Sequence, residues 1–406
     1  MAGVLKNYAS TLILLGAVVL GGVAGVLLPD KVGVVKPVGD IFFNLVYVLI
    51  VPLVFFSICS SVCKLSSSKD AGRVFAAGAC VFVGMAAIAG VIAYIAGLIL
   101  PPVQCSDAAA LLSETTQAQG NALSGTDAIT ATVTVPDFPL LFSKEHLLPM
   151  MFIAALIGFA TSAAGEKGSA FAGFLESGSQ VTMKAMQYVL FLAPLGLGCY
   201  FACTVAAIGS SLLEGYLRVF VMYWALTLVF FFVANPLYML LAQGKKGPSN
   251  YWKHIFPPSL TALSSSSSAV AMPGNILAAQ KMGVPGEIAE SIIPLGTNIH
   301  KDGSMIAAVM KAMFLLLLMG QPVFGVAPAG KILLVGLLAA IVIGAIPGGG
   351  MTGELLTCTL LGFDPSLAGI LVLISTLVDM PATLLNSSSN VVAAALTAKF
   401  TSCPKP

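Results

Sequence analysis

Six long apolar runs, almost free of charge, constrain this chain more than any other feature of its sequence. Each run is close to the 20 or so apolar residues that a helix needs to cross a bilayer. Hydrophobic residues make up 58% of the 406 positions and charged residues only 9%, whereas a soluble domain carries about 25% charged residues. The chain therefore cannot cover a water-facing surface, and we predict an all-α membrane protein. The runs are residues 10–29, 38–62, 74–100, 147–165, 186–209 and 215–243.

The remaining composition excludes several other classes of function. The first run lacks a small-residue cleavage site, so it is interpreted as a transmembrane helix and not as a signal peptide. The formal net charge is +2 and no basic run is present, so nothing indicates a nucleic-acid partner. The eight cysteines are scattered and form no CxxC pair, which predicts neither a zinc site nor redox chemistry. No organic cofactor is expected.

The basic residues predict how the chain is oriented. Lysine and arginine are absent between residues 74 and 143, where four acidic residues occur. Basic residues instead precede the third run, follow the sixth and end the chain, and such residues mark the cytoplasmic side. We therefore expect a multi-pass protein of the cell inner membrane with both termini in the cytoplasm. Eight crossings fit this orientation if two broken stretches after residue 250 are re-entrant.

Two of the breaks after residue 250 have the composition of hairpin tips. Irregular backbone at membrane depth has to line a cavity or pack inside protein, because lipid leaves its polar groups unpaired. Residues Ser264–Ser268 form a serine run that could expose hydroxyl and N–H groups at a tip, or could be a flexible cytoplasmic loop. The glycines of residues 346–350 allow close backbone approach to a ligand, although a plain extracellular turn is the alternative.

The third break places three ionisable residues in the middle of an apolar stretch. Residues Pro294–Ser304 read PLGTNIHKDGS, in which Pro and Gly interrupt the helix and free carbonyls that can coordinate cations. His300, Lys301 and Asp302 are costly at membrane depth, so they are functional candidates. A structural ion pair between Lys301 and Asp302 is the competing interpretation.

The fourth break is a polar stripe on the last helix. Asp379, Thr383, Asn386 and Asn390 recur at i, i+4, i+7 and i+11, which is one helix face. The stripe could be an interhelical hydrogen-bond seam. An unpaired aspartate is harder to explain in that way, so a ligand amine is the preferred partner of Asp379.

These four features, in this order, resemble the dicarboxylate/amino acid:cation symporter family, the glutamate-transporter homologues. Residues 37–58 and 146–160 are similar to that family's second and fourth helices. The resemblance implies eight transmembrane helices plus two re-entrant hairpins, at about 253–284 and 331–364, in a homotrimer that works by an elevator mechanism. It assigns residues 1–73 and 139–209 to a scaffold, and residues 74–138 and 210–406 to a moving transport domain.

The resemblance also implies roles for individual residues. Asp379 would hold the α-amino group of an amino acid and Asn386 its α-carboxylate. The substrate-binding set would be Ser267, Ser268, Ser304, Ile346, Gly350, Asp379, Thr383 and Asn386. The cation ligands would be Gly296, Asn298, His300, Asp302, Asn386 and Asn390.

Departures from the family's pattern affect the expected substrate. Members that carry acidic substrates place an arginine three residues after the aspartate, where this chain has Ala382. The arginine before the hairpin serines is replaced by Ser266. A buried substrate carboxylate prefers a guanidinium fork. We therefore expect a small neutral amino acid such as serine, alanine or threonine.

Other departures affect the coupling ion. The family's Asn-Met-Asp motif is His300-Lys301-Asp302 here, and its sodium-ligating aspartate in the last helix is Asn390. Phe82, Met85 and Ala86 stand where the third helix supplies ligands for a further sodium. We expect Lys301 to act as a tethered cation that compensates Asp302, or to lose and gain a proton. Either predicts fewer coupled sodium ions (Na+) than other members use, or proton coupling.

Three other functions are weighed against this symporter. An intramembrane hydrolase would use one of Ser264–Ser268 as nucleophile and His300 as base, but no oxyanion loop surrounds the serines, so no enzyme is expected. A channel would not accumulate substrate against its gradient. A dicarboxylate or acidic amino acid carrier would bind the anion with Lys301, although an unpaired Asp379 would repel a second carboxylate.

Overall fold

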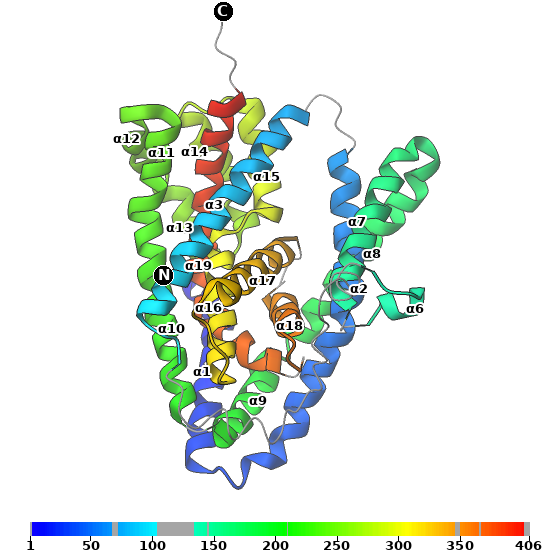
Figure 1. The fold of residues 1–406 in the computed structure, drawn as a ribbon, viewed down its shortest axis with the longest axis vertical. Coiled ribbons are helices and arrows are strands. Elements are labelled where there is room, and N and C mark those ends of the chain that lie inside the picture. The colour runs from blue at the N-terminus through cyan, green and yellow to red at the C-terminus, as the bar shows by residue number, and fades with distance from the viewer. Residues whose placement is uncertain are drawn as a thin grey trace, which may run out of the picture.

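The described part of the chain is built from helices, with no strand in these residues (Figure 1). The computed structural model describes residues 2–66, 72–103, 134–143, 146–208, 210–345, 350–364 and 367–401. The longer helices are α1 (Ala2–Leu27), α2 (Lys36–Ser66), α3 (Gly72–Ile99), α7 (Leu147–Ala163), α8 (Ser169–Leu190), α9 (Ala193–Ile208), α10 (Ser210–Val229), α11 (Asn235–Gln243), α12 (Gly247–His254), α13 (Phe256–Ser265), α14 (Ser268–Lys281), α15 (Gly286–Ile299), α16 (Asp302–Leu318), α17 (Val326–Ala345), α18 (Gly350–Leu361) and α19 (Ala368–Thr401).

The helices pack as two groups. In the first group α9 packs on α1 and α2, while α7 and α8 pack on α2. In the second group α3 and α10 to α18 gather around α19, which contacts most of them. Figure 1 shows α2, α7 and α8 on one flank, with α3, α15 and α19 on the other. Few helix pairs connect the two groups.

All six predicted apolar runs coincide with helices, but one boundary is wrong. The run 186–209 is not one helix: α8 ends at Leu190, α9 begins at Ala193, and the axes differ by 58°. Pro194 explains the break, since a proline has no N–H for the carbonyl four residues earlier, here that of Leu190, and its ring clashes with that carbonyl. Among the described residues four helices are long and apolar enough to span a membrane, or five with this bent pair. Eight crossings therefore remain a prediction.

The serine run forms the turn of a helical hairpin. Helix α13 ends at Ser265, Ser266 reverses the chain with a φ of 47°, and α14 begins at Ser268. The Ser267 hydroxyl accepts a hydrogen bond from the N–H of Val270, which caps α14. The two helices pack on each other and on α19. The run is therefore a structured turn and not a flexible loop.

A second pair of helices follows the same plan. Helices α17 and α18 pack against each other, and both contact α16. Their connection, residues 346–349, lies outside the described residues and includes the predicted site residue Ile346. Helix α18 begins at the predicted tip residue Gly350. Whether either hairpin is re-entrant stays a prediction.

Helices α1 and α9 approach so closely that only small residues fit between them. A Cβ added at Gly25 would overlap the carbonyl oxygen of Ala202 and lie 3.0 Å from the Cβ of Val205. Gly21 faces Gly198 in the same way. Such small-residue contacts let helix backbones meet in membranes, where the hydrophobic effect does not drive association.

This contact predicts that Gly25→Val lowers the free energy of unfolding by about 1–3 kcal/mol, because overpacking forces the backbones apart. Gly16→Val is the matched control, since a Cβ at Gly16 meets nothing within 4 Å. The two variants would be compared by thermal unfolding in detergent. Equal melting temperatures (Tm) would contradict close packing at Gly25.

Candidate substrate and cation site

The site begins at the break between α15 and α16, where the chain is extended for two residues. His300 has φ −115° and ψ 113°, and Lys301 has φ −142° and ψ 80°. Successive side chains of an extended backbone point to opposite sides. His300 and Asp302 therefore share one side of the break, and Lys301 lies on the other.

His300 sits between two oxygen atoms. Its Nε2 lies 3.0 Å from Oδ1 of Asp302, and its Nδ1 lies 2.9 Å from Oδ1 of Asn390 on α19. The approach to Asp302 is an ion pair without hydrogen-bond alignment. The ring stacks on Phe82 of α3, with centroids 4.6 Å apart and planes 13° apart. His300, Asp302 and Asn390 are all buried.

This arrangement corrects the predicted partner of Asp302. We expected Lys301 to compensate Asp302, but the structure places His300 there. The reason is the extended break, in which residues two apart face the same way and adjacent residues do not. Lys301 instead interacts electrostatically with Asp379 on α19.

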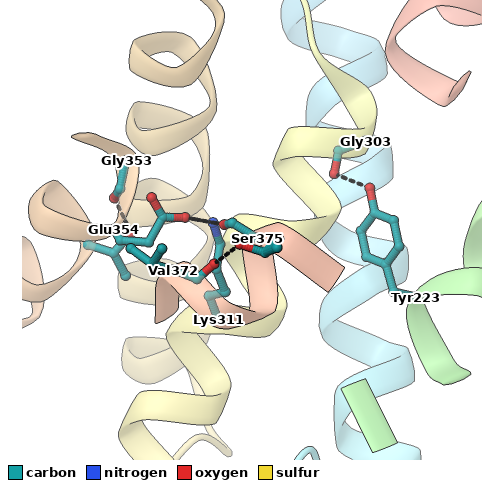
Figure 2. A network of polar contacts seen from close by, with 9 residues as sticks. Tyr223, Gly303, Lys311, Gly353, Glu354, Val372 and Ser375 are labelled. Carbon is teal, nitrogen blue, oxygen red and sulfur yellow. Dashed lines mark hydrogen bonds and ion pairs between the residues drawn. The ribbon is translucent and has the colours of Figure 1, made fainter. Parts of the chain in front are cut away.

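Asp379 has neighbours on several helices. Ser266 at the turn of the first hairpin and Tyr223 of α10 are both close enough to interact with its carboxylate. Figure 2 shows the Tyr223 hydroxyl directed at the carbonyl of Gly303, to which it donates a hydrogen bond of 2.8 Å. Asp379 retains an exposed surface although it stands mid-way along α19. A small molecule can therefore reach this carboxylate, whose charge also interacts with that of Lys301.

The remaining substrate candidates of α16 and α19 meet directly. Oδ1 of Asn386 accepts a hydrogen bond of 3.2 Å from the N–H of Ser304, and its Nδ2 donates one of 3.2 Å to the Ser304 hydroxyl. Thr383 is buried one turn before Asn386. Ser268 is buried at the start of α14, while Ser267 is half-buried.

Of the predicted cation ligands Asn298 and Gly296, only Gly296 lies at the His300 cluster. The Asn298 side chain is exposed and donates to the carbonyl of Pro294 in its own helix, so it does not join the His300 cluster. Gly296 does lie against the cluster, because a Cβ there would overlap Oδ1 of Asn390 and crowd Phe82. Only glycine leaves room for the Asn390 side chain at this position.

The His300 cluster does not fit a sodium ion. Hard cations need a shell of oxygen ligands. The Oδ1 atoms of Asp302 and Asn390 both face the imidazole, and α3 contributes the apolar ring of Phe82, which stacks on it.

Several polar residues of the core have no counterpart in the sequence predictions. Asn275 of α14 donates to Ser387, 2.7 Å away, and Asn235 of α11 donates to Ser388, 3.2 Å away. Tyr223 could not be recognised as a site residue from the sequence, because it lies within a long apolar run.

Lys311 was also missed, although a lone lysine inside an apolar helix marks itself as a functional or structural site. Figure 2 shows its ammonium between Glu354 of α18 and Ser375 of α19. The Lys311–Ser375 distance is 2.8 Å, and the Ser375 hydroxyl also donates to Glu354. Lys311 and Glu354 are both buried.

Known proteins match nearly the whole chain. A sequence model of the sodium:dicarboxylate symporter family matches residues 11–400. A C4-dicarboxylate transport protein of Bacillus subtilis (strain 168) is 27% identical over 314 residues, which cover 76% of this chain and 73% of the relative. A C4-dicarboxylate transport protein of Deinococcus radiodurans is 26% identical over 363 residues, which cover 82% of this chain and 80% of the relative.

Proposed function

Because the chain belongs to the sodium:dicarboxylate symporter family, we propose that it carries a C4 dicarboxylate such as succinate across the inner membrane together with a cation. The names of its relatives favour this substrate over the small neutral amino acid expected from the missing arginines. The second hypothesis of the sequence analysis, a carrier that binds its anion with Lys301, thus becomes the preferred one.

The observation that carries this proposal is the electrostatic interaction between Lys301 and Asp379. An unpaired aspartate in the site would repel a dicarboxylate and would require a substrate amine. Lys301 supplies a positive charge inside the protein, next to Asp379. The charge of Lys301 offsets the negative charge of the Asp379 carboxylate, so this carboxylate needs no amine from the substrate. Lys301 also offers three N–H donors, more than one carboxylate uses.

Donors for the second carboxylate of the substrate are available nearby. The N-terminus of α14 begins at Ser268, and helix N-termini favour anions because their first N–H groups are unpaired. Asn386 can offer its Nδ2 group if it gives up Ser304. In this proposal Lys301 holds one end of the dicarboxylate, and α14 with Asn386 holds the other.

The mode of transport follows from the two helix groups. We assign α1, α2 and α7 to α9 to the scaffold, within residues 1–73 and 139–209. The transport domain is α3 and α10 to α19, within residues 74–138 and 210–406. The sparse contacts between the groups support movement of one past the other. The homotrimer and the cytoplasmic termini are further parts of this proposal.

Uptake into proteoliposomes tests the substrate. Radiolabelled succinate is expected to accumulate under an inward sodium gradient, and unlabelled fumarate or malate to compete with it, while serine and alanine do not. A proton gradient without sodium forms the second arm. Accumulation of serine or alanine but not of succinate would refute the proposal.

A further inference from the structure

We propose that the imidazolium of His300 is a built-in cation that takes the place of one coupling sodium ion. The inference rests on the proposed cation-coupled transport, and it concerns the ion side of the site instead of the substrate side. It uses the geometry around Asp302, where the family pattern would put oxygen ligands for sodium.

The first observation is that both ring nitrogens face oxygen atoms. Oδ1 of Asp302 is 3.0 Å from Nε2, and Oδ1 of Asn390 is 2.9 Å from Nδ1. Carboxylate and amide oxygens accept hydrogen bonds and do not donate them. A neutral imidazole has one N–H and could direct it at only one of these atoms, whereas an imidazolium directs an N–H toward each of them and carries a positive charge.

The second observation is the need of Asp302 for a positive charge. Its side chain is completely buried, and neither of its carboxylate oxygens has a hydrogen-bond partner among the described residues. A buried carboxylate is strongly unfavourable without a counter-charge. His300 is the cationic group in contact with it, because Lys301 is turned to Asp379.

The third observation comes from the groups that surround the cluster. Helix α3 contributes the Phe82 ring, α19 contributes Asn390, and α11 contributes Tyr238, whose hydroxyl interacts with the charge of Asp302. None of these groups brings a second carboxylate. The cluster therefore holds one negative and one positive group, and an added sodium ion would give it an excess positive charge.

The fourth observation is the space that the ring fills. Phe82 covers one face of the imidazole, and Gly296 stands so close that even a Cβ would overlap Asn390. A cation could enter only if the ring left. The site is consequently closed to sodium while His300 is in place.

The experiment compares sodium binding in variants of the full-length protein purified in detergent, without substrate. His300→Ala leaves Asp302 without its counter-charge. Sodium chloride is therefore expected to raise the Tm of this variant by several degrees more than it raises that of the natural protein, relative to equal choline chloride. His254→Ala removes a histidine outside the cluster and is expected to follow the natural protein.

A second variant covers the case in which His300→Ala does not fold. His300→Asn with Asn390→Asp restores two of the oxygen-bearing side chains of the family pattern. Reconstituted with a transported dicarboxylate, this double variant is expected to move one more sodium ion per substrate, measured from the gradients at which net flux stops.

The outcomes separate this inference from the proposed function. A sodium-specific rise in the Tm of the natural protein that His300→Ala abolishes would overturn the inference, as would equal stoichiometries in the natural and double-variant proteins. A failure to transport succinate would leave the Tm comparison intact and would refute only the proposed substrate.

Discussion

Replacing Lys301 by methionine is expected to lower succinate uptake by about 100-fold or more. Removing one member of a buried charge pair typically costs 2–5 kcal/mol, which is a factor of about 30 to several thousand in affinity. The loss has two parts here, because the substrate loses its ammonium partner and Asp379 becomes an uncompensated negative charge facing a dianion. Initial rates of uptake into proteoliposomes, over a range of succinate concentrations, measure the effect.

Two further variants show whether the effect of Lys301→Met comes from the lost charge or from the changed shape of the side chain. Lys301→Met combined with Asp379→Asn removes both charges, and it should recover part of the lost affinity because the repulsion is gone. Lys184→Met removes an exposed lysine of α8 and should transport normally. If Lys301→Met kept the natural affinity for succinate, Lys301 would not be the anion-binding residue.

Replacing Lys311 alone by methionine is expected to lower the free energy of unfolding by about 3–5 kcal/mol. The change leaves the Glu354 carboxylate buried without a counter-charge, which is among the most destabilising single changes known. The loss should fall on the junction of α16, α18 and α19, since the three side chains of this network come from those helices. Thermal unfolding in detergent would register it as a large fall in Tm.

The double replacement Lys311→Met with Glu354→Met should restore most of that stability, because it removes both charges while keeping similar volume. Lys331→Met is the control, since Lys331 is an exposed lysine on the neighbouring α17. A double variant as unstable as Lys311→Met would mean that the network contributes by its hydrogen bonds and shape instead of by charge balance.

Hydropathy predicted the positions of the helices well. A segment of about 20 apolar residues without charges has to form a helix in a bilayer, because only then are its backbone groups hydrogen-bonded. The polar stripe of α19 was also visible, and it does face α16 through Asn386 and the His300 break through Asn390. Helical periodicity alone was enough to place these residues on one face.

The sequence did not predict contacts that depend on the local backbone conformation or on helices far apart in the chain. Adjacency in sequence suggested a Lys301–Asp302 pair, but two extended residues turned the histidine to the aspartate instead. The sequence also could not show which groups surround Asp379, because they come from α10, the first hairpin and the break before α16. Periodicity within one segment cannot show such long-range partners.

The close fit of α1 on α9 has a consequence for the biogenesis of the protein. About 165 residues separate the end of α1 at Leu27 from the start of α9 at Ala193. At roughly 5–20 residues per second, a ribosome needs about 10–30 s to make that stretch. During this interval the face of α1 that carries Gly21 and Gly25 lies in the membrane without α9, its partner in the folded protein. The helix must therefore be stable in lipid by itself, and its packing on α9 can form only after α9 has been inserted.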